Sequence, residues 1–203
     1  NIVNVQDIGM GHTVYRIIDS NQRSFVVKET ESVFPLFYTN VLRILESPFI
    51  KTWSYTKSDR IWTISEYIPG RHLTGFLNDN KCNELMVSQL AKHACIGDVF
   101  GRGDRHFENY LVHEDTLYPL DVSYLFWPKN EDWVDLYVKG GQSECCVLHN
   151  SSEFQSLYWE TYALTFQKLM DNKTVCRDLI GSYFDFSLCE KYQCYVVDRL
   201  SCR

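Results

Sequence analysis

The order in which hydrophobic patterns follow one another along the chain restricts its fold more than any other feature. Runs rich in β-branched and aromatic residues, typical of strands, dominate the first 67 residues. One helical pattern, over residues 35–46, interrupts them, and helical spacing dominates from residue 83 onward. Strands and helices that are segregated in this way favour an α+β fold over a parallel α/β fold.

The first part of the chain predicts a five-stranded antiparallel sheet with one inserted helix. Three strands form a meander over residues 1–28, with turn residues at 19–22 and the last strand ending on Lys28. Pro35 suits the first position of the helix, and Ser47-Pro48 ends it. Two more strands follow at residues 50–55 and 61–67.

The remainder predicts a mainly helical lobe. Pro69-Gly70 breaks the strand pattern and is a candidate hinge, which divides the chain into a small lobe at 1–69 and a helical lobe at 70–203. A chain of 203 residues suits one domain made of two such lobes. Helices are expected at residues 83–100, 152–170, 175–183 and 188–200.

Composition excludes several classes of function. The net charge is −6 and no basic stripe is visible, so we expect no nucleic-acid partner. No apolar run approaches the roughly 18 residues of a membrane span. The eight cysteines are irregularly spaced, and Cys145, Cys146 and His149 match no tetrahedral zinc spacing. Reduced thiols and a cytoplasmic location are therefore expected.

The segment from Gly103 to Val112 carries the candidate chemistry. Asp104 and Asn109 are five residues apart in a loop, and a β-hairpin after it would return Asp121 to the side of Asn109. Transfer of a phosphoryl group needs a carboxylate at the acceptor hydroxyl and oxygen ligands that hold Mg²⁺ against the phosphates. The spacing of these three residues predicts such a site.

Asp104-Arg105-His106-x-x-Asn109, followed by a short hairpin and an aspartate, resembles the catalytic and metal-binding loops of one group of kinases. The group comprises phosphoinositide 3-/4-kinases, actin-fragmin kinase and bacterial HipA-like serine/threonine kinases. The resemblance is strong over about residues 91–121. It implies a two-lobed protein-kinase-like fold, ATP and Mg²⁺ as cofactors, and Asp104 as catalytic carboxylate. It also implies that Asn109 and Asp121 bind Mg²⁺ and that His106 contacts the phosphoryl group or supports the loop, whereas Arg105 has a structural role.

The small lobe offers residues for the nucleotide. Lys28, at the end of Val26-Val27-Lys28, resembles the kinase strand that carries an ATP-binding lysine. Gly9 and Gly11 form a small loop whose N–H groups could lie on the phosphates, although a third glycine is missing. The segment from Glu66 to Ile68 occupies the place of a kinase hinge and would offer main-chain groups to adenine.

Two departures from the kinase pattern keep alternatives open. Residues 35–45 contain no acid that could pair with Lys28, so its partner is Glu29, Glu31, Glu46 or Asp121. Asp121 is followed by Val122-Ser123 instead of Phe-Gly. We expect a HipA-like kinase that phosphorylates Ser or Thr hydroxyls of a protein substrate. The alternatives are a phosphoinositide or small-alcohol kinase, and a nucleotide-binding pseudokinase that regulates a partner.

Overall fold

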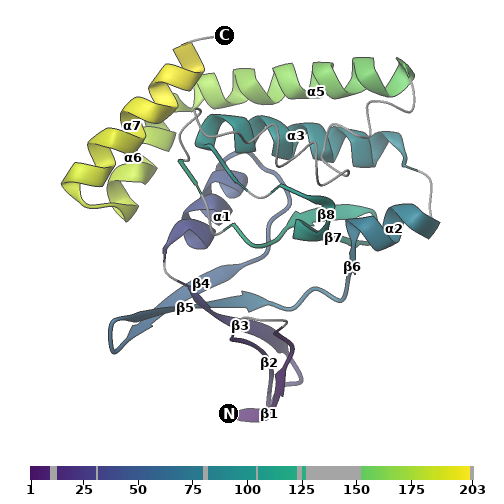
Figure 1. Cartoon of the computed structure of the whole chain (residues 1–203), viewed down its shortest axis with the longest axis vertical. Coiled ribbons are helices and arrows are strands. Elements are labelled where there is room, and N and C mark those ends of the chain that lie inside the picture. The colour runs from purple at the N-terminus through teal and green to yellow at the C-terminus, as the bar shows by residue number, and fades with distance from the viewer. Residues whose placement is uncertain are drawn as a thin grey trace.

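The computed structural model of the chain places a twisted sheet at one end and a group of helices at the other, with a small second sheet between them (Figure 1). The amino terminus lies at the sheet end, and the carboxy terminus lies beside the helices. The structure describes residues 1–9, 13–30, 32–79, 82–103, 105–122, 125–126 and 152–201.

The larger sheet has five antiparallel strands, as the sequence predicts. Their spatial order is β1-β2-β3-β5-β4, so only the β3–β5 contact joins strands that are not consecutive. Ser58 and Asp59 both adopt positive φ, which gives the two-residue turn between β4 and β5 the twist that a tight hairpin needs. The strands are β1 Ile2–Asp7, β2 Val14–Asp19, β3 Ser24–Thr30, β4 Thr52–Lys57 and β5 Arg60–Glu66.

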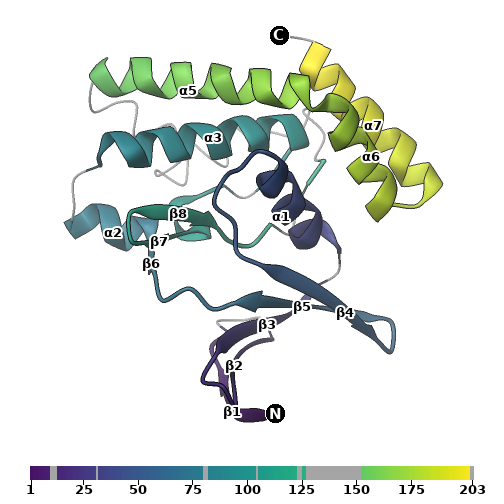
Figure 2. The ribbon, with the colours of Figure 1, turned by 180° about the vertical axis from the view of Figure 1, so that it is seen from behind.

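Helix α1 (Phe34–Ile44) lies between the sheet and the helical lobe (Figure 2). Pro35 occupies its first turn, where a missing N–H costs no hydrogen bond. Its buried face packs into an aromatic cluster: the ring of Phe37 lies 5.6 Å from Phe100 and 5.6 Å from Phe126. The helix is therefore fixed to the helical lobe by side chains, although it is inserted between two strands of the sheet.

The helical lobe is built around α3 (Glu84–Phe100). The Asn83 side chain caps its first turn by accepting a 2.9 Å bond from the Met86 N–H, and Gly101 ends it in a left-handed conformation. Helix α5 lies along α3, and the other helices flank this pair (Figure 1). Within the described part of the chain, no helix is both long enough and apolar enough to cross a membrane. The further helices are α2 Leu73–Asp79, α5 Ser152–Asp171, α6 Lys173–Tyr183 and α7 Phe186–Ser201.

A second, three-stranded sheet connects the two ends of the molecule. The predicted hairpin is present as β7 (Tyr110–His113) and β8 (Thr116–Pro119), and β6 (Arg71–His72) pairs with β7. The sequence did not predict β6, because two residues are too few to show a strand pattern, nor did it predict α2. Gly70 leads into β6, and a Cβ atom there would lie 2.7 Å from the Val112 carbonyl oxygen. Only glycine permits this close approach of two backbones.

Candidate functional site

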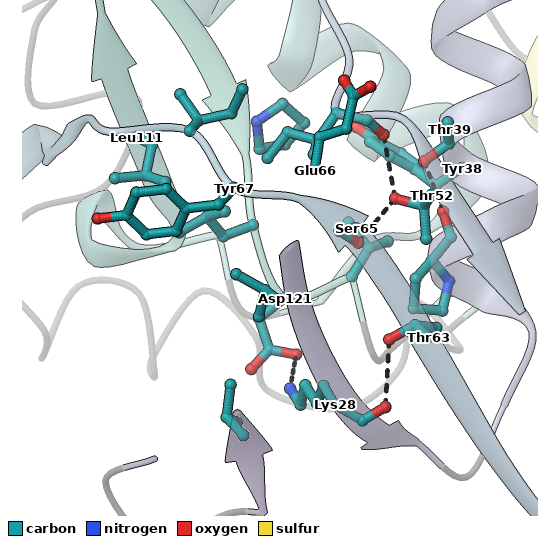
Figure 3. Close-up of a pocket in the computed structure, with 18 of the residues that line it drawn as sticks. Lys28, Tyr38, Thr39, Thr52, Thr63, Ser65, Glu66, Tyr67, Leu111 and Asp121 are labelled. Carbon is teal, nitrogen blue, oxygen red and sulfur yellow. Dashed lines mark hydrogen bonds and ion pairs between the residues drawn. The ribbon is translucent and has the colours of Figure 1, made fainter. Parts of the chain in front are cut away.

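A cavity of about 440 Å³ lies between the two sheets (Figure 3). One side, the sheet wall, is formed by β2, β3 and β5 and presents Val14 and Val26. The opposite side, the hairpin wall, is formed by β7, β8 and the residues that follow them, and it presents Leu111, Leu120 and Val122. The volume and the two apolar walls are typical of a site for a small ligand.

An ion pair joins the two walls. The Lys28 ammonium on β3 lies 2.7 Å from the Asp121 carboxylate, which directly follows the hairpin (Figure 3). Both side chains remain partly open to solvent, at 25% and 38% exposed. Among the partners that the sequence allows for Lys28, the structure selects Asp121.

The other acidic candidates have different partners or cannot be placed. Glu29 pairs with Arg60 and Glu46 pairs with Lys168, whereas Glu31 lies outside the described residues. Helix α1 borders the cavity with apolar and hydroxyl side chains and no acid, as the sequence implies. The cavity therefore has a lysine on one wall and a carboxylate on the other, but no acid from α1 beside the lysine.

The two predicted metal ligands lie at the same end of the hairpin. Asn109 ends a short 3₁₀ turn (Phe107–Asn109), and its carbonyl accepts a 2.7 Å bond from the Leu120 N–H. Asp121 follows Leu120 directly. Asn109 therefore lies just before β7 and Asp121 just after β8, at the same end of these two paired strands. Asp121 has a φ of 43°, a left-handed conformation that aspartate tolerates better than most residues.

The remaining residues of the predicted catalytic loop are placed in part. Asp104 lies outside the described residues. His106 is exposed and precedes the 3₁₀ turn. Arg105 pairs with Asp98 of α3 at 2.9 Å, which agrees with the expected structural role. Gly97 makes room for it, because a Cβ atom there would lie 2.9 Å from the Arg105 side chain.

Three polar side chains that the sequence did not single out brace the hairpin wall from below. Gln89 accepts a 2.6 Å bond from the Leu117 N–H and donates a 2.8 Å bond to the Asp115 carbonyl, near the turn. His93 lies 3.4 Å from the Leu117 carbonyl, and its burial lowers its pKa to about 3. Arg102 bonds the opposite end of the hairpin. For Gln89 and His93 the available signal was a polar residue within the largely apolar segment of α3; for Arg102, in a polar loop, there was none.

Residues 66–68, at the place where the sequence predicts a kinase-like adenine-binding segment, border the cavity. Glu66, Tyr67 and Ile68 all line it, while the Glu66 carboxylate pairs with Lys51 at 3.5 Å. The N–H groups of Glu66 and Tyr67 bond the Lys51 and Ser24 carbonyls. Among the described residues the Ile68 N–H has no hydrogen-bond partner. It is therefore available to a ligand that brings an acceptor.

The glycine loop is described only at its start. Gly9 does not line the cavity, and its N–H donates a 3.0 Å bond to the Asp7 carboxylate. The neighbouring Ile8 does line the cavity, and Gly11 lies outside the described residues. Contact between this loop and phosphate groups stays a prediction.

The donor set fits magnesium that is shared with a nucleotide. Within the described ranges, no group of three or more His, Cys, Asp and Glu side chains could form a metal site of protein ligands alone. Magnesium, however, commonly takes one or two protein oxygens and completes its octahedron with phosphates and water. Of the two predicted ligands, the Asp121 side chain lines the cavity, whereas Asn109 is buried and is not among the lining residues. Binding of magnesium by this pair stays a prediction.

Comparison with known proteins identifies the architecture. No protein-family model and no curated protein matches the sequence. Among solved structures, the chain is similar to the crystal structure of a Helicobacter pylori proinflammatory kinase, CtkA, with a TM-score of 0.66 and 11% sequence identity. The alignment covers 99% of this chain and 92% of that chain. At this identity the likeness shows the fold: the chain has a two-lobed, protein-kinase-like α+β fold.

Proposed function

We propose that this chain is an ATP- and Mg²⁺-dependent phosphotransferase that transfers the γ-phosphoryl group of ATP to a hydroxyl group. The observation that carries the proposal is the Lys28–Asp121 pair across the cavity, with Asn109 beside Asp121 on the hairpin. These residue types at these places are those that hold the phosphates and the metal in kinase-like enzymes.

Adenine would lie between the two apolar walls. Val26 on the sheet wall and Leu111 on the hairpin wall border the cavity from opposite sides. The Ile68 N–H would donate a hydrogen bond to the base, since it has no other acceptor among the described residues. This placement directs the phosphates toward Lys28 and Asp121.

The chain's own residues would then divide the remaining work. Lys28 would leave Asp121 and neutralise phosphate charge as a point cation. Asn109 and Asp121 would hold Mg²⁺, which, when bound, neutralises negative charge that develops on the phosphates. Asp104 would orient the acceptor hydroxyl and receive its proton, and His106 would contact the transferred group or support the loop.

The expected acceptor is a Ser or Thr hydroxyl of a protein, as the resemblance to HipA-like kinases implies. A phosphoinositide is disfavoured by the net charge of −6 and the absence of a basic patch in the sequence, because anionic headgroups attract clustered Lys and Arg. Incubation with labelled ATP and either protein or lipid acceptors, followed by separation of the products, distinguishes these substrates.

The first prediction concerns Asp104. Replacing it by alanine removes the carboxylate at the acceptor but leaves both walls of the cavity intact. We expect transfer of labelled phosphate to fall by at least about 100-fold, as is typical for loss of a general base, while ATP binding measured by calorimetry changes by less than about 3-fold. Unchanged turnover in Asp104→Ala would remove this residue from the mechanism.

One observation favours a second candidate, a nucleotide-binding pseudokinase. Because α1 supplies no acid to the cavity, Lys28 lacks the partner from that helix that active protein kinases use. Tight binding of ATP by the wild-type protein, without any transfer to itself or to generic acceptors, would favour this candidate over the enzyme.

A further inference from the structure

Arg102 is a charged side chain in the interior of the helical lobe. It lies in the loop that leads from α3 to Asp104 and is only 2% exposed. Its Nη1 donates a 3.0 Å bond to the Tyr110 hydroxyl, and its Nη2 donates a 2.8 Å bond to the Leu120 carbonyl. Burying a guanidinium group is strongly unfavourable unless its donors are satisfied. An aliphatic side chain would avoid that cost, so the bonds themselves need an explanation.

The bond to Leu120 acts at the base of the predicted metal site. The Leu120 N–H bonds the Asn109 carbonyl at 2.7 Å, and the Leu120 carbonyl accepts from Arg102 at 2.8 Å. These two groups belong to successive peptide planes, and the second plane ends at the nitrogen of Asp121. The orientation of both planes relative to the catalytic loop is therefore fixed by hydrogen bonds.

Asp121 needs such a restraint because its backbone conformation is unfavourable. A left-handed conformation, with φ of 43°, is disfavoured for a residue other than glycine. Without the bond from Arg102, the Leu120–Asp121 peptide could rotate and carry the carboxylate away from Asn109. Tyr110 holds the other side of the guanidinium, whose carbon lies 5.0 Å from the Tyr110 ring centre.

We propose that Arg102 is a positioning residue that, by bonding the Leu120 carbonyl, holds the Asp121 carboxylate beside Asn109 and thereby sets the affinity of the chain for the divalent cation. The inference rests on the proposed function, because it takes Asn109 and Asp121 as the ligands. It extends that function to a residue outside the cavity that contacts neither metal nor nucleotide.

Gln89 provides a matched control. It is also buried and also clamps the hairpin through two hydrogen bonds, but it does so at the turn, at Asp115 and Leu117. If Arg102 merely stabilised the hairpin, loss of Arg102 and loss of Gln89 would change stability and metal binding in the same way. If Arg102 positions Asp121, only its loss weakens metal binding.

The test titrates Mn²⁺ in the presence of a non-hydrolysable ATP analogue and follows free Mn²⁺ by electron paramagnetic resonance. We expect Arg102→Met to raise the dissociation constant of Mn²⁺ by about 10- to 100-fold, the range usual for residues that orient metal ligands. Binding of the analogue without metal should change by less than about 2-fold. Arg102→Lys, whose compact ammonium cannot span both acceptors, should give an intermediate value.

Gln89→Leu is expected to lower the urea midpoint of unfolding while leaving the Mn²⁺ dissociation constant within about 2-fold of the wild type, because the bonds that it loses lie at the turn. Equal weakening of Mn²⁺ binding in Gln89→Leu and Arg102→Met would overturn the proposal, and so would unchanged Mn²⁺ binding in Arg102→Met.

A milder variant covers the case in which Arg102→Met does not fold. Tyr110→Phe removes only the hydroxyl that anchors the guanidinium, and it should raise the Mn²⁺ dissociation constant by about 3-fold or more; an unchanged value would overturn the proposal. A wild-type protein that binds no Mn²⁺ with the analogue would contradict the proposed function itself, which separates the two failures.

Discussion

The two walls of the cavity are held in place by different means. In the sheet wall, Thr63 is the only buried residue that the structure describes within the five strands, so main-chain pairing provides most of its cohesion. The hairpin wall rests on α3, which is buried along most of its length and supplies Gln89 and His93 as supports. The sheet wall is thus lightly packed, whereas the hairpin wall is supported by a buried helix.

Substitutions in the two walls should therefore have different effects on ligand binding and on stability. Side chains on the sheet wall contact the cavity but carry little of the core, so changing them should alter ligand binding more than stability. Side chains beneath the hairpin wall carry the core, so changing them should lower the free energy of unfolding first. Regions with few buried apolar contacts also open more readily, and the sheet end is the place where opening of the cavity is expected.

The largest expected loss of stability comes from a substitution beneath the hairpin wall. Leu90 on α3 is completely buried, and Leu90→Ala should lower the free energy of unfolding by about 2–5 kcal/mol, through lost transfer energy and the cavity left behind. Ile17→Ala removes a side chain of equal size from β2, where Ile17 is only partly buried, and should cost about 1 kcal/mol. Urea unfolding of both variants gives the comparison, and equal losses would contradict it.

The next effect concerns the sheet wall. Lys28→Met should raise the dissociation constant of an ATP analogue by about 10-fold, since one phosphate-binding cation is lost. The free energy of unfolding should change by less than about 1 kcal/mol, because the pair with Asp121 is partly solvated. Calorimetry and urea unfolding measure the two quantities.

Lys51→Met serves as the control for Lys28. Lys51 also forms an ion pair, with Glu66 at 3.5 Å, but it does not line the cavity. Its substitution should leave nucleotide affinity unchanged. A loss of affinity as large as that of Lys28→Met would show that nonspecific charge, and not the position of Lys28, attracts the phosphates.

The last expected effect is a pH dependence of stability that arises beneath the hairpin wall, at His93. Burial, with the nearby Arg102 charge, lowers the pKa of His93 to about 3, so between pH 6.5 and 3 the unfolded chain binds a proton that the folded chain does not. This contribution to stability is complete above pH 6.5 and decreases as the pH falls. His93→Phe loses the contact with the Leu117 carbonyl at either pH, but its free energy of unfolding relative to the wild type should be higher at pH 5 than at pH 7 by up to about 2 kcal/mol. Urea unfolding at both pH values tests this expectation, and a constant difference would refute it.

The sequence predicted those parts of the site that depend on local spacing. The loop before Asn109 and the hairpin that returns Asp121 are close in sequence, so their juxtaposition follows from a two-residue turn. The absence of acid in α1 likewise left Asp121 among the few partners for Lys28. The order of strands and helices sufficed for the fold class because the two kinds of pattern hardly overlap.

Features that depend on distant contacts could not be predicted. Strand β6 exists because Gly70 brings the chain against Val112, more than forty residues away. The bond from Arg102 to the Leu120 carbonyl could not be predicted, because the sequence of a loop does not show which carbonyl a side chain will reach. Helix boundaries shifted by one or two residues, as at α1 and α7, because fraying and capping are decided by local geometry.

The most direct measurement is a crystal structure of the wild-type protein with Mn²⁺ and a non-hydrolysable ATP analogue, with the metal located by its anomalous scattering. The account predicts the base between the two walls, one metal ion bonded to both Asn109 and Asp121, and the Lys28 ammonium moved from Asp121 to a phosphate oxygen. A nucleotide bound elsewhere, or a metal that contacts neither Asn109 nor Asp121, would contradict the assignment of this cavity as a phosphotransfer site.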